Sequence, residues 1–228
     1  MGPLLKVCGA TRDADPALLA GAGAGLVGLW HGVPGGPAEL SADRLARLAD
    51  AVRATGTAEP VLVTFLADVA ALTAVLRRTG IRWVQLHAYQ PPGVVRALKA
   101  AAPDAVVVKV LHLRDGACVE SRFVPFYTRA GTDLFLLDRV AEDGRVGSTG
   151  VALAPGDVLR AATGLPRPFL LAGGLGAGNA GDYAAATALP GYAGIDVDTA
   201  ARAAGGAFDP AAVAAIAAGW GIGAPAPS

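Results

Sequence analysis

A cysteine and an aspartate, far apart along the chain, each end an apolar run. Cys8 closes the run Leu4–Cys8, and Asp138 closes the run Leu134–Asp138. In a barrel of parallel strands, both side chains lie at the carboxyl rim, where such barrels carry out chemistry. A thiolate that accepts a proton and a carboxylic acid that donates one can isomerise a small molecule without metal or cofactor. The pair therefore predicts an isomerase with Cys8 and Asp138 as catalytic residues.

Spacing along a strand decides which side chains meet inside the barrel, because residues two apart point to the same face. Lys6 shares the face of Cys8, and Gln85 shares the face of His87. With these faces inward, Cys8, His87 and Asp138 surround one pocket, and Lys6 lies beneath the cysteine. An ammonium there is expected to lower the pKa of the thiol. The alternative is that Cys8 is a small buried apolar residue and Asp138 a turn residue.

Eight short apolar runs are predicted to be strands that are covered on both faces. They are Leu4–Cys8, Leu26–Trp30, Val61–Phe65, Trp83–His87, Val106–Leu111, Leu134–Asp138, Phe169–Ala172 and Tyr192–Val197. Capped or amphipathic stretches between them predict helices. These are Asp15–Ala24, Ala42–Ala54, Ala67–Thr79, Pro91–Ala101, Asn179–Ala188 and Asp209–Ala218.

Repeated alternation of strands and helices predicts a single (β/α)₈ TIM barrel over residues 1–220, with a flexible tail at 221–228. In the first helix, Asp15 is expected to be the N-cap and Pro16 the first helical residue. The alternative fold is an open, doubly wound sheet. That fold usually carries a Gly-rich phosphate turn after its first strand, and Cys8–Thr11 is not such a turn.

The composition indicates a globular protein with a large core. Of 228 residues, 53% are hydrophobic and 17% charged, and the net charge is +0, so neither a nucleic acid nor an anionic membrane is an expected partner. The 2 cysteines, Cys8 and Cys118, form no disulfide or metal motif, which favours reduced thiols in the cytoplasm. His112 and Cys118 are expected to pack in a loop. We expect a small-molecule substrate and a monomer or homodimer.

Six short motifs resemble those of the phosphoribosylanthranilate isomerases and occur in the same order. They are Lys6–Thr11, Val84–His87, Leu136–Asp138, Gly147–Gly150, Leu171–Leu175 with Asn179 following, and Gly194–Val197. The resemblance spans about residues 4–198. The chain is therefore similar to a divergent member of this family of tryptophan-biosynthesis barrels.

The resemblance implies an Amadori rearrangement, an aldose–ketose isomerisation of an N-phosphoribosyl arylamine. Asp138 would be the general acid that protonates the furanose oxygen, and Cys8, as thiolate, the base that removes the proton from sugar C2. The reaction needs no metal and no cofactor. Lys6, Gln85 and His87 are expected to contact the substrate.

Two loops are expected to bind the phosphate. Gly173 and Gly174 follow the seventh strand, and Asp198 and Thr199 follow the eighth, which is a recurrent phosphate site in such barrels. The glycines let the backbone approach the anion closely, and amides at the start of the following helix can point at it.

Three positions depart from the family pattern. The segment after the second strand lacks the family's arginine, and His31 is a candidate to replace it as the group that binds an anion; exposure to water is the alternative. Arg139 is another candidate for holding a negatively charged substrate. Asp198 would repel a phosphate unless it turns away or Arg202 compensates. A lysine of the family is also missing from Gly206–Asp209.

These departures leave two further hypotheses open. One is a repurposed barrel of a specialised biosynthetic pathway, which would use the same acid and base on a different, non-phosphorylated substrate. The other is a non-catalytic ligand-binding barrel, in which substitutions of Cys8 and Asp138 would barely affect binding.

Overall fold

Eight parallel strands form a closed barrel in the computed structural model, which describes residues 2–140 and 152–223. The strands are β1 (Leu4–Cys8), β2 (Leu26–Trp30), β3 (Glu59–Thr64), β4 (Trp83–Leu86), β5 (Val106–Arg114), β7 (Leu134–Arg139), β8 (Phe169–Leu171) and β9 (Tyr192–Val197). Their order is β4-β3-β2-β1-β9-β8-β7-β5, and β4 pairs with β5 to close the ring. The predicted (β/α)₈ barrel is confirmed, and the open sheet is wrong.

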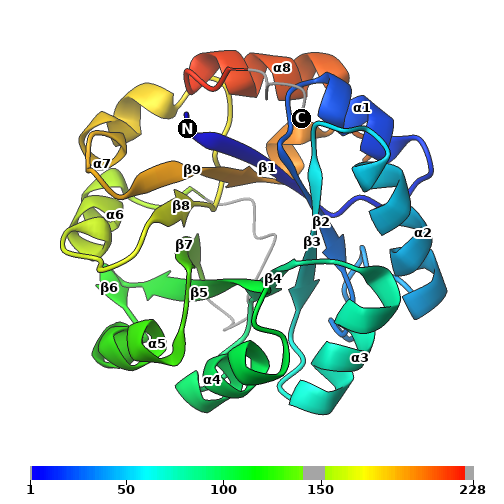
Figure 1. Cartoon of the computed structure of the whole chain (residues 1–228). Helices are drawn as coiled ribbons and strands as arrows, with labels where there is room; N and C mark the ends of the chain where they lie inside the picture. The colour runs from blue at the N-terminus through cyan, green and yellow to red at the C-terminus, as the bar shows by residue number, and fades with distance from the viewer. Residues whose placement is uncertain (1, 141–151, 224–228) are drawn as a thin grey trace.

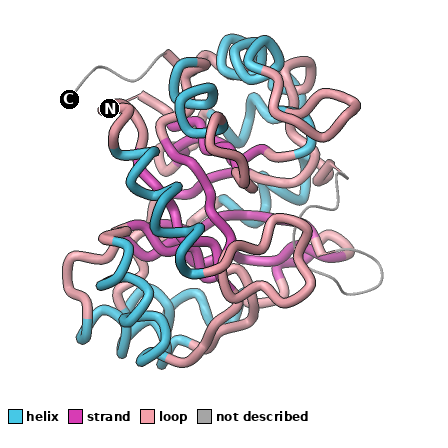
Figure 2. The backbone as a smooth tube through the Cα atoms, turned by 90° about the vertical axis from the view of Figure 1, so that its right-hand side faces the viewer, coloured by secondary structure: helices cyan, strands magenta, loops and turns pink. Residues whose placement is uncertain are grey.

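Helices surround the barrel (Figure 1), and the side view shows the strands inside this shell (Figure 2). They are α1 (Asp15–Gly21), α2 (Ala42–Arg53), α3 (Val69–Thr79), α4 (Pro92–Ala101), α5 (Val124–Ala130), α6 (Pro155–Ala162), α7 (Ala184–Thr187) and α8 (Pro210–Gly219). Short 3₁₀ turns lie at η1 (Ser121–Phe123), η2 (Ala180–Tyr183) and η3 (Thr199–Ala201). A short strand, β6 (Ala117–Cys118), pairs antiparallel with the end of β5.

Local capping explains several helix boundaries. The Ser41 side chain accepts a hydrogen bond from the Arg44 amide at the start of α2, and Gly80 ends α3 in the left-handed conformation. Asp15 is not the N-cap of α1, because it is already helical and Ala14 holds that position. Its carboxylate instead accepts hydrogen bonds from the amides of Thr11 and Arg12 at 2.9 and 2.8 Å, which fixes the loop after β1.

Two sequence predictions about elements need correction. The segment Asn179–Ala188 is not one helix, since η2 and α7 divide it. Strand β5 runs on to Arg114, three residues beyond the prediction, because its end pairs with β7 and with β6. His112 therefore lies within a strand and is fully buried, not in a loop.

Alternation along the strands separates two apolar regions. Leu5, Val7 and their equivalents on the other strands pack outward against the helices. Cys8 and Trp30 belong to one inward-facing cluster, and Val108 and Leu136 belong to another. The predicted inward face of β1, β4 and β7 is therefore the observed one, so the polar side chains at the ends of these strands meet at the barrel mouth.

Packing of the barrel extends beyond residue 220. Ile222 is buried, and its amide donates to the Ala217 carbonyl. Residues 224–228 of the predicted tail lie outside the described residues. Within residues 2–140 and 152–223, no helix has the length and apolar character needed to cross a membrane.

Candidate active site

Cys8 lies at the carboxyl end of β1 and is buried among groups from neighbouring strands. The Trp30 indole N–H donates to Cys8 Sγ at 3.1 Å. Gly28, on the neighbouring strand β2, makes room for the thiol, because a Cβ on Gly28 would lie 2.8 Å from Sγ. Any larger residue at position 28 would displace the thiol. The absence of a side chain at Gly28 therefore leaves room for the sulfur atom at this point of the rim.

Burial dominates the acidity of this thiol. It raises the pKa of Cys8 to about 12, although Lys6 and the Trp30 hydrogen bond both act to lower it. The expected lowering by Lys6 is present, but the expected low pKa is wrong. The physical reason is that the thiolate loses more free energy of hydration on burial than it gains from attraction to one nearby ammonium group. In the ligand-free protein, Cys8 is therefore a neutral thiol at pH 7.

This raised pKa predicts a pH-dependent difference between the wild type and Cys8→Ala. Between about pH 9 and pH 12, the unfolded chain releases the Cys8 proton while the folded chain keeps it. The unfolded state then binds fewer protons, so Cys8 lowers the free energy of unfolding as pH rises, by up to about 1.4 kcal/mol per pH unit. Urea unfolding at pH 8 and pH 10 should show the wild type losing about 1 kcal/mol relative to Cys8→Ala. A difference independent of pH would contradict the buried thiol.

Lys6 is committed to a buried ion pair. Its Nζ lies 2.7 Å from Asp196 Oδ2 across the β1–β9 pairing, and the two residues are 1% and 8% exposed. Burial acts to lower the pKa of Lys6, but the opposing effects of Asp196 and Cys8 are larger together. The pKa of Lys6 is therefore raised, and the ammonium stays charged. Lys6 was predicted to contact the substrate. The structure shows its charge balanced by Asp196 beneath the thiol.

Asp138 lies at the carboxyl end of β7, where one carboxylate oxygen accepts a hydrogen bond and the other faces His87. The Arg139 amide donates to Oδ1 at 2.8 Å, and His87 Nε2 lies 3.4 Å from Oδ2. On the other side of the His87 ring, Gln85 Nε2 lies 2.8 Å from Nδ1. Strand parity thus correctly places Gln85, His87 and Asp138 together inside the barrel.

The other two candidates for binding an anion have protein partners. His31 Nδ1 lies 2.8 Å from the Leu40 carbonyl oxygen and 3.8 Å from Glu39 Oε1. A carboxylate so close to the ring disfavours a second anion at His31. The Arg139 guanidinium donates to the Ala152 carbonyl at 3.3 Å.

The loops after β8 and β9 lie at the carboxyl end of the barrel. Gly173 and Gly174 have φ angles of 83° and 63°, which only glycine adopts readily. Their amides, and the amide of Thr199, donate to no acceptor within residues 2–140 and 152–223. Asn179 fixes the first loop by bonding to the Gly174 carbonyl and the Gly176 amide. Such unpaired amides can form a binding site for an anion. The prediction that a long helix starts after these loops is wrong, because short 3₁₀ turns follow them.

Arg202 neutralises Asp198 in the loop after β9. Its Nε lies 2.6 Å from Asp198 Oδ1, and its Nη2 donates to the Gly9 carbonyl at 2.9 Å. The guanidinium also lies 3.9 Å from the centre of the Phe208 ring. Asp198 was expected either to turn away from a phosphate or to be compensated by Arg202, and the structure shows the ion pair with Arg202. The negative charge that opposed a phosphate in this loop is therefore balanced.

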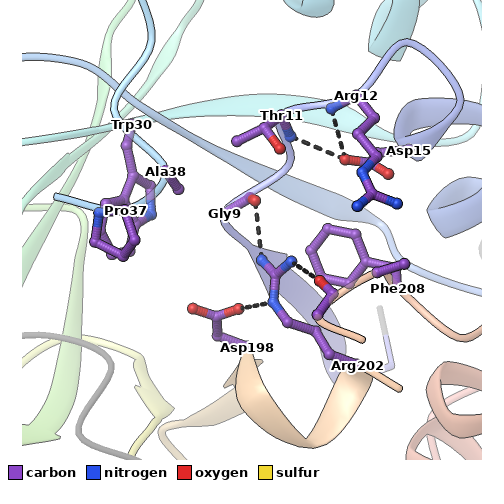
Figure 3. Close-up of a pocket in the computed structure, with 12 residues that line it drawn as sticks. Gly9, Thr11, Arg12, Asp15, Trp30, Pro37, Ala38, Asp198, Arg202 and Phe208 are labelled. Atoms are coloured by element: carbon purple, nitrogen blue, oxygen red, sulfur yellow. Dashed lines mark hydrogen bonds and ion pairs between the residues drawn. The ribbon is translucent and has the colours of Figure 1, made fainter. Parts of the chain in front are cut away.

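A cavity of about 320 Å³ opens between the loops after β1, β2 and β9 (Figure 3). Trp30, Pro37 and Ala38 lie on one side of it, and Arg12 and Phe208 on the other. The full lining is Gly9, Thr11, Arg12, Asp15, Trp30, Pro37, Ala38, Asp198, Arg202, Gly206, Ala207 and Phe208. Cys8 is not among these lining residues; Trp30 lines the cavity and donates its indole N–H to Cys8 Sγ.

Arg12 was missed as a candidate. Within the described residues its guanidinium makes no hydrogen bond and no ion pair, whereas Arg202 in the same cavity is paired. The sequence offers a weak signal, because Arg12 lies in the loop that follows the first strand. That loop gives no spacing rule for the direction of a side chain, so only the structure places Arg12 at the cavity.

A second buried polar cluster was also missed. His112 Nδ1 lies 2.5 Å from Glu120 Oε1, and its Nε2 lies 3.1 Å from the His87 carbonyl oxygen. Burial acts to raise the pKa of Glu120, but hydrogen bonds and charge from His112 and Lys109 lower it. Burial also lowers the pKa of Lys109 to about 8. Burial and the charge of Glu120 raise the pKa of Cys118 to about 11.

The motif Gly147–Gly150 lies outside the described residues. The remaining motifs all occur at the carboxyl rim or on strands that lead to it. A thiol, a carboxyl group, unpaired loop amides and a free guanidinium thus meet at one end of a (β/α)₈ barrel. These are the kinds of group that acid–base chemistry on an anionic small molecule uses.

The chain belongs to the N-(5'-phosphoribosyl)anthranilate (PRA) isomerase family, whose model matches residues 6–218. It is 34% identical over 199 residues to the N-(5'-phosphoribosyl)anthranilate isomerase of Afipia carboxidovorans, covering 87% of this chain and 81% of the relative. The resemblance inferred from the six motifs is therefore confirmed.

Solved structures agree on the fold. A phosphoribosyl anthranilate isomerase from Thermus thermophilus superposes with a TM-score of 0.77 at 20% identity, covering 96% of this chain and 98% of that one. Another enzyme of that name has been solved with reduced 1-(o-carboxyphenylamino)-1-deoxyribulose 5-phosphate bound. It gives a TM-score of 0.71 at 20% identity, with 97% and 100% coverage.

Proposed function

We propose that this chain catalyses the Amadori rearrangement of N-(5'-phosphoribosyl)anthranilate, the isomerisation for which its relatives are named. The observation that carries the proposal is the pairing of Cys8 and Asp138. Each residue occupies an inward-facing position near the carboxyl end of its strand, at the rim of a barrel from this family. We place the reaction in tryptophan biosynthesis. Two free cysteines support a cytoplasmic location.

The reaction begins at the sugar ring. Asp138 gives its proton to the furanose oxygen as the C1–O bond breaks, and the nitrogen lone pair forms a C1=N⁺ iminium. Cys8 then removes the proton from C2, and the C2–H electron pair forms the C1=C2 bond of an enol-amine. As the C1=C2 bond forms, the C1=N⁺ π pair returns to nitrogen. The enol-amine becomes the ketose when C1 gains a proton and the C2 hydroxyl loses one to form the C2=O bond. Every proton comes from the enzyme or from water.

Ionisation of Cys8 follows from this order of events. In the empty site, burial keeps the thiol neutral. Once the iminium has formed, its positive charge lies one atom from C2 and favours a thiolate nearby. The Trp30 N–H adds a hydrogen bond that lowers the pKa of Cys8. Trp30 therefore supports the base in addition to lining the cavity.

Two parts of the site are suited to the two anionic groups of this substrate. The unpaired amides of Gly173, Gly174 and Thr199 support a phosphate site after β8 and β9. The free guanidinium of Arg12 in the neighbouring cavity supports a site for the aryl carboxylate. Arg12 thus supplies the positive charge that the loop after β2 lacks.

Replacing Arg12 with alanine should raise the KM of the carboxylated substrate about 10-fold, with kcat within about 3-fold of the wild type, because a charged hydrogen bond to a ground-state group is lost. Steady-state kinetics measures both constants. The N-phosphoribosyl derivative of aniline, which has no carboxylate, is the matched control and should show the same KM with both enzymes. An equal change for both substrates would contradict this role.

Binding of the reduced product analogue tests the proposed function without turnover. Calorimetric titration with reduced 1-(o-carboxyphenylamino)-1-deoxyribulose 5-phosphate should show one site per chain, and inorganic phosphate should compete for it. Absence of binding to the folded protein would overturn the proposal. The Asp198–Arg202 ion pair removes the electrostatic reason for a non-phosphorylated substrate, so we propose no second function.

A further inference from the structure

A row of buried polar groups leads from the core of the barrel to Asp138. We propose that Gln85 and His87 are positioning residues that hold Asp138 in the geometry of a proton donor. This inference rests on the proposed function, because it assigns Asp138 the role of the acid.

The His87 ring has protein groups at both nitrogens. Gln85 Nε2 lies 2.8 Å from Nδ1, and Asp138 Oδ2 lies 3.4 Å from Nε2. Gln85 has no exposed surface, and His87 is 7% exposed. With the Gln85 amide donating, Nδ1 is the acceptor, so the neutral ring carries its proton on Nε2 and points it at the carboxylate. Within the described residues Gln85 Oε1 and His87 Nε2 are buried without a hydrogen-bond partner, and Asp138 Oδ2 is the carboxylate oxygen next to Nε2.

Three further contacts restrain the His87 ring, the His87 backbone and the Asp138 carboxylate. Phe65 stacks on the His87 ring with centroids 5.9 Å apart, and His112 Nε2 hydrogen-bonds the His87 carbonyl at 3.1 Å. Asp138 Oδ1 accepts from the Arg139 amide. With Oδ1 tied to the backbone and Oδ2 facing His87, the plane of the carboxyl group is fixed before substrate arrives.

A fixed carboxyl group matters because proton transfer needs short, aligned geometry. A displacement of about 1 Å in a reacting group can lower a rate about 10²-fold. The 3.4 Å separation of His87 and Asp138 is longer than a good hydrogen bond, as is common before substrate closes a site. Loss of the His87 donor should therefore lower kcat and leave KM nearly unchanged.

Two substitutions of His87 by residues with side-chain amides distinguish a positioning role from substrate binding and from a purely structural role. In His87→Gln the side-chain nitrogen takes the place of Nε2 and faces Asp138, whereas in His87→Asn it takes the place of Nδ1 and faces Gln85. We expect His87→Asn to lower kcat about 30-fold, with KM within about 3-fold, and His87→Gln to recover about 10-fold of that loss. Equal losses in the two variants, a rise in KM with constant kcat, or no change in either constant would each overturn the proposal.

A spectroscopic measurement tests the same arrangement without turnover. The chain has 3 histidines, so ¹⁵N NMR of the wild-type imidazoles can be assigned with single variants. We expect His87 as the neutral Nε2–H tautomer, with its Nδ1 resonance shifted in Gln85→Leu. An Nδ1–H tautomer in the wild type would overturn the positioning role, whether or not the protein turns over. If the tautomer is as expected but wild-type turnover is absent, the proposed function fails, and with it the role assigned to Asp138.

Discussion

Replacing Cys8 with alanine, or Asp138 with asparagine, is expected to lower the turnover of N-(5'-phosphoribosyl)anthranilate about 10²- to 10⁴-fold. Each variant removes one proton-transfer group at the barrel mouth and leaves the strand that carries it in place. Because the enzyme acts on bonds at C1 and C2 in sequence, either loss slows the whole reaction. Steady-state kinetics, with circular dichroism as a check on folding, measures the effect.

Cys8→Ser is the matched control for the first variant. Serine has nearly the size of cysteine and fits the space left by Gly28, but its hydroxyl is a far weaker acid than a thiol. If Cys8 acts as the base, the serine variant should lose nearly as much activity as the alanine variant. Near-normal turnover in Cys8→Ser would show that the residue only fills space. Near-normal turnover in both Cys8→Ala and Asp138→Asn would refute the mechanism.

The second large effect is expected for the ion pair beneath the thiol. Asp196→Asn leaves the Lys6 ammonium buried without its carboxylate partner, and removing one member of a buried pair typically costs about 3 to 5 kcal/mol. The free energy of unfolding, measured by urea denaturation, should fall by about that amount. A loss below about 1 kcal/mol would show that the pair is not isolated from water.

The double variant Lys6→Met with Asp196→Leu separates pairing from packing. It removes both charges and keeps apolar side chains of comparable length in the barrel interior. Replacing a whole buried pair by apolar residues is often close to neutral for stability. The double variant should therefore be more stable than Asp196→Asn alone. The opposite order would indicate that hydrophobic groups cannot fill this part of the barrel.

Strand positions and their inward faces could be predicted from the sequence because they depend on local patterns. The runs Leu4–Cys8 and Leu26–Trp30 became strands with the predicted bounds. Strand β5 was predicted too short, because its end is held by pairing with β7 and with Ala117–Cys118. Helices α5 and α6 were not predicted. Each has only 7 or 8 residues and a proline in the first turn, so its apolar period is short.

The chemistry of the site was harder to predict because it depends on contacts between distant segments. The sequence placed Lys6 beneath Cys8, but it did not show that Asp196, 190 residues later, balances the ammonium. It also did not show how completely the thiol is removed from water, which decides the pKa of Cys8. Arg12 and Glu120 lie in loops, where no periodicity gives side-chain direction, so neither the cavity position of Arg12 nor the contact of Glu120 with His112 followed from the sequence.

The most direct test of the central claim is turnover of enzymatically generated N-(5'-phosphoribosyl)anthranilate by the wild-type protein, followed by loss of its fluorescence. The Cys8→Ala protein provides the background rate. We predict rapid loss of fluorescence that depends on Cys8, which would mean that Arg202 and Arg12 make up for the changed loops. If the folded wild-type protein causes no faster loss of fluorescence than the Cys8→Ala protein, the proposed function is contradicted.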